Sequence, residues 1–191
     1  MPGTPIDPMV LPPGLPVPVD DGAAAHLVGL VVPDIALPAT DGRAVSLGRL
    51  GSRRTVVYAY PRTGRPGEPS LVDDWDLIPG ARGCTPETCG FRDHHAEMQR
   101  AGADVFGLST QDSAYQAELV ERLHLPFSIL SDEKLTLTHA LRLPTFEVTG
   151  QTLLKRLTFI IRAGRIEQVW YPVFPPDRHA DDVLAWLTAN R

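Results

Sequence analysis

The sequence predicts an α/β fold in which helices cover both faces of a central mixed β-sheet. Three observations support this prediction. Strand-like and helix-like segments alternate through the middle of the chain, two strand-like segments near the C-terminal end are joined by a tight turn, and a last helix-like segment follows. The chain has 191 residues, enough for one domain with its own hydrophobic core. We find no internal repeat and no second domain.

Proline sets the start of the chain apart. Residues 1–20 contain seven prolines and little core-forming pattern. We therefore expect residues 1–24 to form an extended or disordered arm that lies against the body. Globular patterning begins near Leu27, and we assign residues 25–191 to a single domain.

A small N-terminal hairpin and a central strand are expected next. Residues 36–38 and 44–47 flank Asp41-Gly42, a pair that is typical of tight β-turns. Residues 55–60 are almost continuously apolar and rich in β-branched and aromatic side chains. This pattern is typical of a strand that is buried on both faces.

The segment 61–83 is long for a loop. It is rich in proline, glycine and aspartate, and we interpret residues 64–80 as an insertion. Trp75 and Ile78 are the side chains expected to anchor it to the body.

Helices and strands alternate through the rest of the chain. The expected elements are a helix at 85–100, a strand at 104–109, a helix at 113–123, a strand at 127–130, a helix at 132–141 capped by Ser131 or Asp132, strands at 156–162 and 166–171 joined at Ala163-Gly164, and a helix at 179–189. The alternating part favours parallel strands and the hairpin is antiparallel, so the sheet is expected to be mixed.

Composition excludes several classes of function. The net charge is −5 and no basic run occurs, which argues against a nucleic-acid surface. No apolar segment approaches the ~18 residues of a membrane span, and the start of the chain lacks the features of a secretory signal. Two cysteines do not make a disulfide scaffold, so we expect a reducing, cytoplasmic location.

Cys84 has the sequence context of an activated thiol. It precedes Thr85-Pro86, a typical helix start, because proline lacks the N–H that would be unpaired there and threonine can cap. The N–H groups and dipole at a helix N-terminus favour an anion such as a thiolate. A free thiol has a pKa of about 8.5, and this position predicts a lower pKa for Cys84.

Cys89 lies five residues further along the same predicted helix. Residues with this spacing lie roughly 8–9 Å apart in an intact helix. A disulfide needs about 4.4–6.8 Å between the Cα atoms, so a bond between Cys84 and Cys89 requires the first turn to unwind. Gly90 weakens the helix at that point. The spacing favours a pair that is oxidised and reduced in alternation over a permanent disulfide.

The two cysteines also have a structural and a metal-binding alternative. Either they are inert buried thiols, or they bind zinc together with His94 and His95. Zinc binding is the weaker alternative, because four residues between each pair is not a usual zinc spacing and adjacent helical histidines point about 100° apart. We expect no metal site.

These segments together resemble a peroxiredoxin of the bacterioferritin-comigratory-protein (peroxiredoxin Q) class, which has the thioredoxin-like fold. The resemblance spans roughly residues 30–190 and implies a thioredoxin-like fold with an N-terminal β-hairpin extension. The matching motifs are Cys84-Thr85-x-x-x-Cys89-Gly90-Phe91-Arg92-Asp93, Tyr58-Ala59-Tyr60-Pro61, Gly107-Leu108-Ser109-Thr110, Leu130-Ser131-Asp132, Arg156-Leu157-Thr158-Phe159 and Ala163-Gly164-Arg165-Ile166.

The resemblance implies a thiol peroxidase that reduces hydrogen peroxide and small organic hydroperoxides. It implies that Cys84 is the peroxidatic cysteine, that Cys89 resolves its sulfenic acid as an intramolecular disulfide, and that Arg156 is the active-site arginine. It also implies a thioredoxin or a similar dithiol protein as reductant, and no cofactor. Independently of the family, a guanidinium beside a thiolate favours the ionised form of the sulfur.

The chain departs from the family pattern just before Cys84. The family usually has a threonine three residues before the cysteine and a proline three residues before that threonine, but here Ala81 stands in the threonine position. We expect the insertion to bulge out and to leave Pro61 and Thr63 beside Cys84, with the hydroxyl of Thr63 contacting the peroxide.

Thr85 is the alternative to Thr63 for this contact. Gly83, which immediately precedes the cysteine, is expected to contribute to substrate binding together with Pro61 and Thr85.

Two further functions are compatible with the sequence. One is a thiol–disulfide oxidoreductase or redox sensor, against which the absence of a Cys-x-x-Cys motif argues. The other is a catalytically inactive thioredoxin-like interaction domain, for which the departure at Ala81 is the indication. The sequence is compatible with a monomer or a homodimer.

Overall fold

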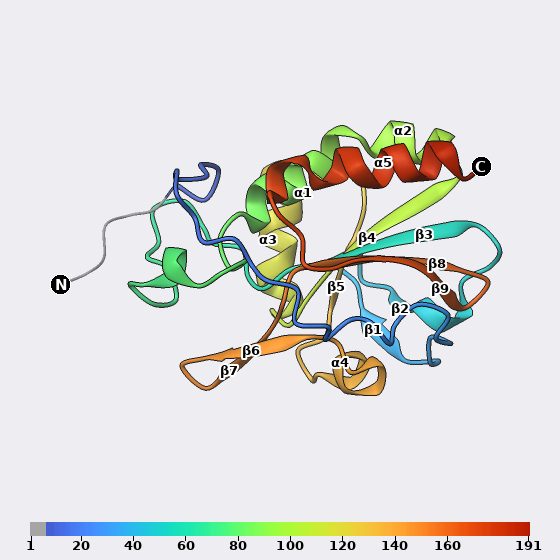
Figure 1. The fold of residues 1–191 in the computed structure, drawn as a ribbon, viewed down its shortest axis with the longest axis horizontal. Coiled ribbons are helices and arrows are strands. Elements are labelled where there is room, and N and C mark those ends of the chain that lie inside the picture. Colours follow the sequence, from blue (N-terminus) through green and yellow to red (C-terminus); the bar gives the residue numbers. More distant parts are fainter. Residues whose placement is uncertain (1–6) are drawn as a thin grey trace.

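A five-stranded sheet runs through the middle of the computed structural model, which describes residues 7–191 (Figure 1). Its spatial order is β5-β4-β3-β8-β9. The strands are β3 (Arg54–Ala59), β4 (Ala103–Ser109), β5 (Ile129–Ser131), β8 (Leu157–Arg162) and β9 (Arg165–Trp170). β3, β4 and β5 are parallel, whereas β8 is antiparallel to both β3 and β9. The predicted mixed sheet is therefore confirmed.

The central strand β3 is buried on both faces, as its apolar sequence predicts. Val56 and Tyr58 pack into the cluster on one face of the sheet. Val57 and Ala59 pack into the cluster on the other face. This alternation follows from the two-residue period of a strand, so one short segment joins two hydrophobic cores.

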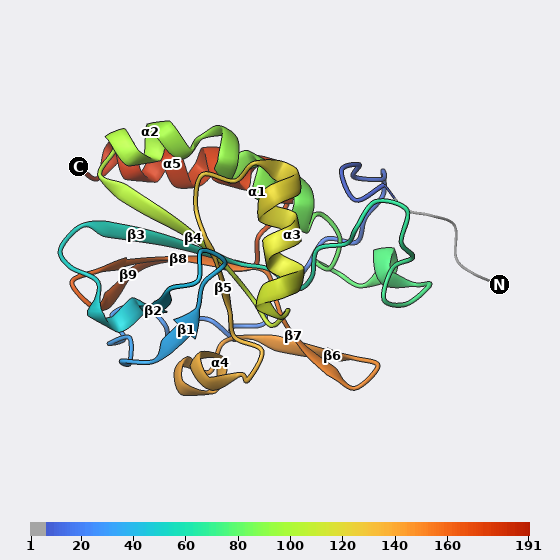
Figure 2. The same ribbon diagram turned by 180° about the vertical axis from the view of Figure 1, so that it is seen from behind.

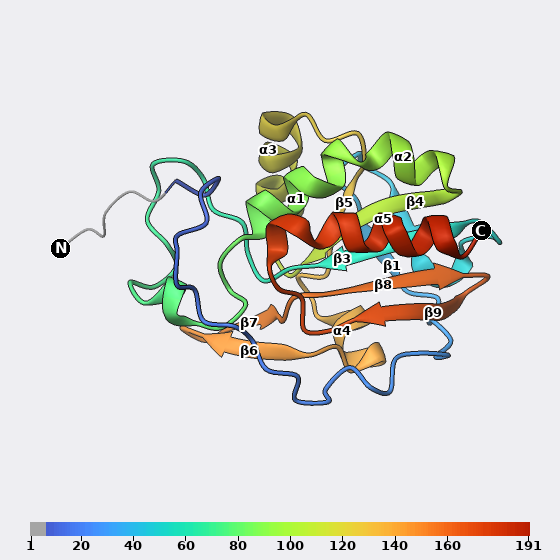
Figure 3. The same ribbon diagram turned by 45° about the horizontal axis from the view of Figure 1, so that its top comes forward.

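Four helices lie on one face of the sheet (Figures 1 and 3). They are α1 (Cys84–Asp93), α2 (His95–Arg100), α3 (Ser113–Leu123) and α5 (His179–Ala189). Short 3₁₀ turns, η1 (Leu47–Arg49), η2 (Trp75–Leu77) and η3 (Pro176–Arg178), connect other segments. Within residues 7–191, no helix is long and apolar enough to cross a bilayer.

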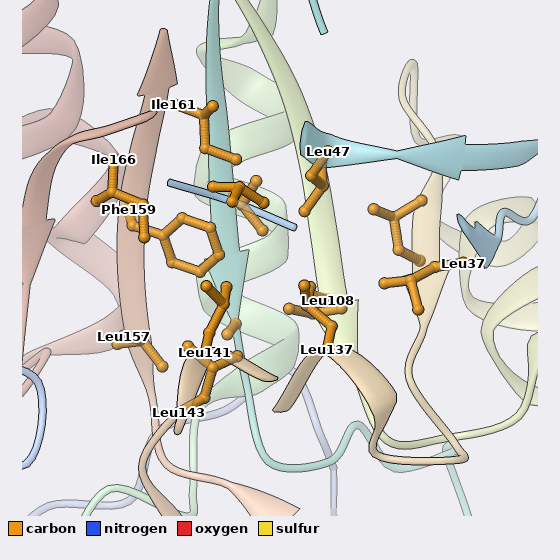
Figure 4. Packing of buried hydrophobic residues seen from close by; sticks show 14 of the residues in the cluster. Leu37, Leu47, Leu108, Leu137, Leu141, Leu143, Leu157, Phe159, Ile161 and Ile166 are labelled. Carbon is orange, nitrogen blue, oxygen red and sulfur yellow. The ribbon is translucent and has the colours of Figure 1, made fainter. Parts of the chain in front are cut away.

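The opposite face is covered by α4 (Thr136–Leu141) and by the small hairpin β1 (Ala36–Pro38) and β2 (Ala44–Ser46), as the view from behind shows (Figure 2). The predicted N-terminal hairpin is confirmed, and Gly42 in its turn has the left-handed φ of +84° that favours glycine. Leu37 and Leu47 from this layer face Leu108 and Phe159 from the sheet (Figure 4).

The N-terminal arm is bound to the body wherever the structure describes it. Of the predicted arm, residues 1–6 lie outside the described residues. The carbonyl oxygens of Asp7 and Val10 accept hydrogen bonds from Arg82. Further along, Asp21 pairs with Lys155 at 2.6 Å. Leu27, which follows the arm, is fully buried in the core at 0% exposure.

The predicted helix at 85–100 is wrong in one respect, because two helices occupy that range. His94 separates α1 from α2 with a φ of −94° and a ψ of 3°. Its imidazole lies between Glu97, at 2.6 Å, and Asp181 of α5, at 2.7 Å. The helix break therefore lies at His94, whose side chain joins α2 to the C-terminal helix α5. The local sequence pattern does not indicate this contact.

The predicted helix at 132–141 begins later than expected. α4 starts at Thr136, and Leu135 before it has a positive φ of 57°. The carboxylate of Asp132 accepts the backbone N–H groups of Leu137 and Thr138. Asp132 thus caps the helix from four residues upstream, which lets residues 132–135 form a turn.

Two strands were not predicted. β6 (Thr145–Val148) and β7 (Gln151–Leu154) form an antiparallel hairpin that projects from the sheet (Figure 3). Thr149 and Gly150 between them both have positive φ, at 49° and 76°, as a two-residue hairpin turn requires. The short β-rich segments on either side of Thr-Gly were the signal for it.

Shortening Leu27 should destabilise the protein, because it removes methyl groups from a closed core. We expect Leu27→Ala to lower the free energy of unfolding by about 2–5 kcal/mol. Val28→Ala is the matched control, because Val28 is 59% exposed and its loss should cost no more than about 0.5 kcal/mol. Urea unfolding curves measure both changes. Equal stability of the two variants would show that Leu27 does not contribute to the core.

Candidate active site

The register of the sheet brings distant segments together at one end of it. Ala59 pairs with Leu157 in the antiparallel ladder between β3 and β8. Residues just after β3 and just before β8 are therefore neighbours, which places Tyr60 and Arg156 side by side. The N-terminus of α1, with Cys84 as its first residue, meets the same end.

Cys84 begins α1, as predicted, but Thr85 does not cap the helix. Gly83 is the N-cap residue and has a φ of 102°. A Cβ atom on Gly83 would lie 2.4 Å from Cγ of Pro176 in η3. Glycine is thus needed at position 83 both for its backbone conformation and because a side chain would not fit. Cys84, the next residue, is buried in the site at 3% exposure.

Arg156 is the centre of the site. Its Nη2 donates a hydrogen bond to Sγ of Cys84 at 3.1 Å, and Nη1 donates to Oε2 of Glu87. Nη2 also lies 3.2 Å from the carbonyl oxygen of Gly80 and 3.1 Å from that of Arg82. The side chain is buried, so this guanidinium holds a thiol, a carboxylate and the end of the insertion in one place.

The pKa of Cys84 differs from the sequence prediction. Burial raises the pKa of the Cys84 thiol, and the Glu87 carboxylate raises it further. The guanidinium of Arg156 and the backbone amide of Arg62 lower the pKa but do not outweigh burial. Sγ of Cys84 also lies 3.5 Å from the carbonyl oxygen of Ala81.

Glu87 is a buried carboxyl group that titrates near neutral pH. Burial raises its pKa to about 7, against the opposing effect of Arg156. Its spacing of three residues from Cys84 on α1 puts both side chains on the same helix face. The sequence shows this spacing, but the contact with Arg156 comes only from the tertiary structure.

A cavity of about 270 Å³ opens beside Cys84. Of the predicted substrate-binding residues, Thr63, Thr85 and Gly83 line it and Pro61 does not. Insertion 64–80 loops back, so Thr63 and Cys84 border one space although they are far apart in the sequence.

Gln111 holds Thr63 in position, and the sequence carried no signal for it. Its Oε1 accepts the backbone N–H of Thr63 at 3.0 Å and the Thr63 hydroxyl at 3.1 Å. Its Nε2 donates to the Thr63 carbonyl oxygen at 3.2 Å. The hydroxyl of Thr63 therefore donates its proton to Gln111, and the lone pairs on the hydroxyl oxygen can still accept a hydrogen bond from another group.

Cys89 lies further along α1 and is buried, which raises the pKa of its thiol. Both cysteines are free thiols, and the helix between them is continuous. For the zinc alternative, no group of three His, Cys, Asp or Glu side chains suited to a metal is found within residues 7–191.

The chain matches the family described as Redoxin over residues 27–184. It is 32% identical to Peroxiredoxin Bcp of Escherichia coli over 168 residues, which cover 83% of this chain and 94% of the relative. It is also 32% identical to the chloroplastic Peroxiredoxin Q of Oryza sativa subsp. japonica over 160 residues, or 83% of this chain. The chain spans 65% of the length of that plant relative.

Among solved structures, the crystal structure of Peroxidoxin BcpB from Mycobacterium tuberculosis is similar to this chain. The TM-score is 0.69 and the sequence identity is 30%. The likeness covers 87% of this chain and 99% of the other.

Replacing Glu87 by glutamine should lower the pKa of Cys84, because it removes a negative charge that opposes the thiolate. Glu87 has a pKa of about 7 and is itself neutral below that pH. Glu87→Gln should therefore react faster than wild type with iodoacetamide above pH 7, and the two rates should converge below it. The pH profile of Cys84 alkylation measures this.

Glu97→Gln is the matched control for this change. Glu97 lies on α2, is partly exposed and pairs with His94, so its loss should leave the alkylation profile of Cys84 unmoved. Identical profiles for Glu87→Gln and wild type above pH 7 would contradict the coupling of Glu87 to the thiol.

Proposed function

We propose that this chain, which belongs to the Redoxin family and within it to the peroxiredoxins of the Q and Bcp type, is a thiol-dependent peroxidase. Membership confirms the family expected from the cysteine motif, and the likeness to the mycobacterial structure confirms the thioredoxin-like fold. The observation that carries the proposal is the 3.1 Å contact between Arg156 and Sγ of Cys84 at the edge of a cavity.

In the first step, the thiolate of Cys84 attacks the terminal oxygen of hydrogen peroxide or a small organic hydroperoxide. The O–O bond breaks, the sulfur gains a hydroxyl and becomes a sulfenic acid, and water or alcohol leaves. The proton lost by the thiol ends on the leaving oxygen. Arg156 stabilises the thiolate and donates to the oxygen on which negative charge develops.

Oxygen lone pairs on Thr63 supply the complementary contact. Because the Thr63 hydroxyl already donates to Gln111, its oxygen is oriented to accept the O–H of the peroxide. A peroxide that donates to Thr63 and accepts from Arg156 is held with its terminal oxygen toward Cys84.

In the second step, the thiol of Cys89 attacks the sulfenic sulfur, which releases water and forms a disulfide. Cys84 and Cys89 lie five residues apart on an intact α1, so the first turn must unwind. Gly90 lowers the cost of unwinding because glycine is a weak helix former. Unwinding also exposes the oxidised sulfur of Cys84, which is buried in the folded helix.

In the third step, a dithiol protein of the thioredoxin type reduces the disulfide by exchange. The three steps use the side chains of this chain and the reductant alone. A reducing compartment such as the cytoplasm suits this cycle.

Serine variants of the two cysteines separate their roles. Cys84→Ser should abolish hydroperoxide consumption with a thioredoxin system, because no sulfenic acid forms. Cys89→Ser should consume one equivalent of peroxide per chain and then stop, because the sulfenic acid has no resolving thiol. Stopped-flow peroxide assays measure both. Turnover by Cys84→Ser would reverse the assignment, and inactivity of wild type would refute the peroxidase function.

Removing the Thr63 hydroxyl should slow the peroxide reaction. We expect Thr63→Val to reduce the rate constant of Cys84 oxidation about three- to tenfold, the value of one lost hydrogen bond. Thr188→Val, on the exposed face of α5, is the control and should react like wild type. A full rate in Thr63→Val together with a slow Thr85→Val would assign the contact to Thr85 instead.

A further inference from the structure

The cavity beside Cys84 is rich in arginine. Its lining includes three arginines, Arg62, Arg65 and Arg82, and one carboxylate, Glu68. A hydroperoxide needs only small polar contacts at its O–O group, so this excess of positive charge is not explained by the three chemical steps.

Two of the three guanidinium groups have carboxylate partners. Nη1 of Arg65 lies 3.7 Å from Glu68, and its Nε lies 3.5 Å from Glu118 of α3. Nη1 of Arg82 lies 3.7 Å from Asp76, and its Nη2 donates to two backbone carbonyls of the N-terminal arm. These arginines help to close the insertion and the arm over the cavity.

Arg62 has no such partner. Within residues 7–191, no carboxylate lies within 4.0 Å of its side chain, and residues 1–6 contain no aspartate or glutamate. Its guanidinium lies over the ring of Tyr115, 5.1 Å from the centroid. Stacking on an aromatic face orients a guanidinium and leaves its N–H groups available to a ligand.

Arg62 is a neighbour of Cys84, the residue whose sulfur reacts. The backbone amide of Arg62 faces Cys84 and lowers the pKa of that thiol. Arg62 and Tyr115, over whose ring the Arg62 guanidinium lies, both line the cavity that borders Cys84. A small ligand in this cavity of about 270 Å³ therefore lies between residues that include both Arg62 and Cys84.

The rest of the cavity wall is partly apolar. Pro69, Leu71 and Trp75 from the insertion contribute to it. A cation at one side and an apolar wall at the other suit an amphiphilic ligand with one negative group.

We propose that Arg62 binds the carboxylate of an organic hydroperoxide acid, so that the site prefers carboxylate-bearing hydroperoxides over their neutral esters. The inference rests on the proposed peroxidase function and adds its substrate class. A carboxylate accepts two parallel hydrogen bonds from a guanidinium, which fixes both the distance and the direction of the hydroperoxide tail. The apolar wall of the insertion holds the carbon skeleton between the two polar ends.

The test compares cumene hydroperoxide carrying a para carboxylate with the methyl ester of the same compound. Wild type should show a higher kcat/KM for the acid than for the ester, by about fivefold. Arg62→Ala should bring the ratio near one, Arg62→Glu should invert it, and added salt should reduce it in wild type. Arg49→Ala, an exposed arginine paired with Asp34, is the control whose ratio should match that of wild type.

A binding measurement separates this inference from the peroxidase function. Cys84→Ser protein is titrated calorimetrically with para-isopropylbenzoate and with the neutral para-isopropylbenzamide, neither of which needs a redox reaction. Tighter binding of the benzoate that is lost in Cys84→Ser with Arg62→Ala supports the carboxylate site. Equal kcat/KM for acid and ester in an enzyme that reduces hydrogen peroxide would overturn the substrate class and leave the peroxidase function intact. Loss of all peroxide reduction with benzoate binding retained would overturn the peroxidase function, and with it the substrate class, and would leave only the carboxylate-binding site at Arg62.

Discussion

The buried guanidinium of Arg156 is the group that organises this end of the molecule. A buried charge is stable only when it is paired and its donors are satisfied. The two Nη groups of Arg156 meet this need with Cys84, with Glu87 and with carbonyl oxygens at and just after the end of the insertion, whereas its buried Nε has no hydrogen-bond partner within the described residues. The same contacts join the start of β8, the first turn of α1 and residues 80–82. A sulfur, a carboxyl group and a loop are thus held together because one positive charge has to be neutralised.

This arrangement exposes the Cys84 thiol to opposing effects on its pKa. Burial raises the pKa of Cys84 above that of a free thiol, although a guanidinium lies beside it. Glu87 adds a second negative centre whose own pKa is about 7. Thiolate formation is therefore favoured when Glu87 is neutral. Unwinding of the first turn of α1 is needed only afterwards, when Cys89 has to reach the oxidised sulfur.

The insertion and the N-terminal arm lie outside the sheet and its covering helices, and residues of both border the site. A separate hydrophobic cluster, formed by Trp75, Ala81, Val148 and Leu153, attaches the insertion to the β6–β7 hairpin. The arm is tied to the end of the insertion through Arg82. Figures 1 and 3 show the arm and the insertion together at the end of the molecule away from the C-terminus. Arg65 of the insertion, together with Arg62 and Arg82 on either side of it, lines the cavity beside Cys84.

Local sequence signals were enough to predict the type and order of most elements. Apolar periodicity located β3, β4, α3 and α5, and turn residues located the β1–β2 hairpin, because those signals act within a few residues. They also identified Cys84 as the start of a helix, whereas Arg156 was identified only through the resemblance to the peroxiredoxin family. The β6–β7 hairpin was missed although Thr149-Gly150 signalled it.

Only the tertiary structure shows how these residues act on one another. The register that pairs Ala59 with Leu157 brings Arg156 to Cys84, and no local pattern encodes a contact between residues so far apart. No local pattern encodes the hydrogen bond between Thr63 and Gln111 or the helix break at His94 either. The direction of the Cys84 pKa was predicted wrongly, because a helix N-terminus is visible in sequence whereas burial arises only when distant segments pack together.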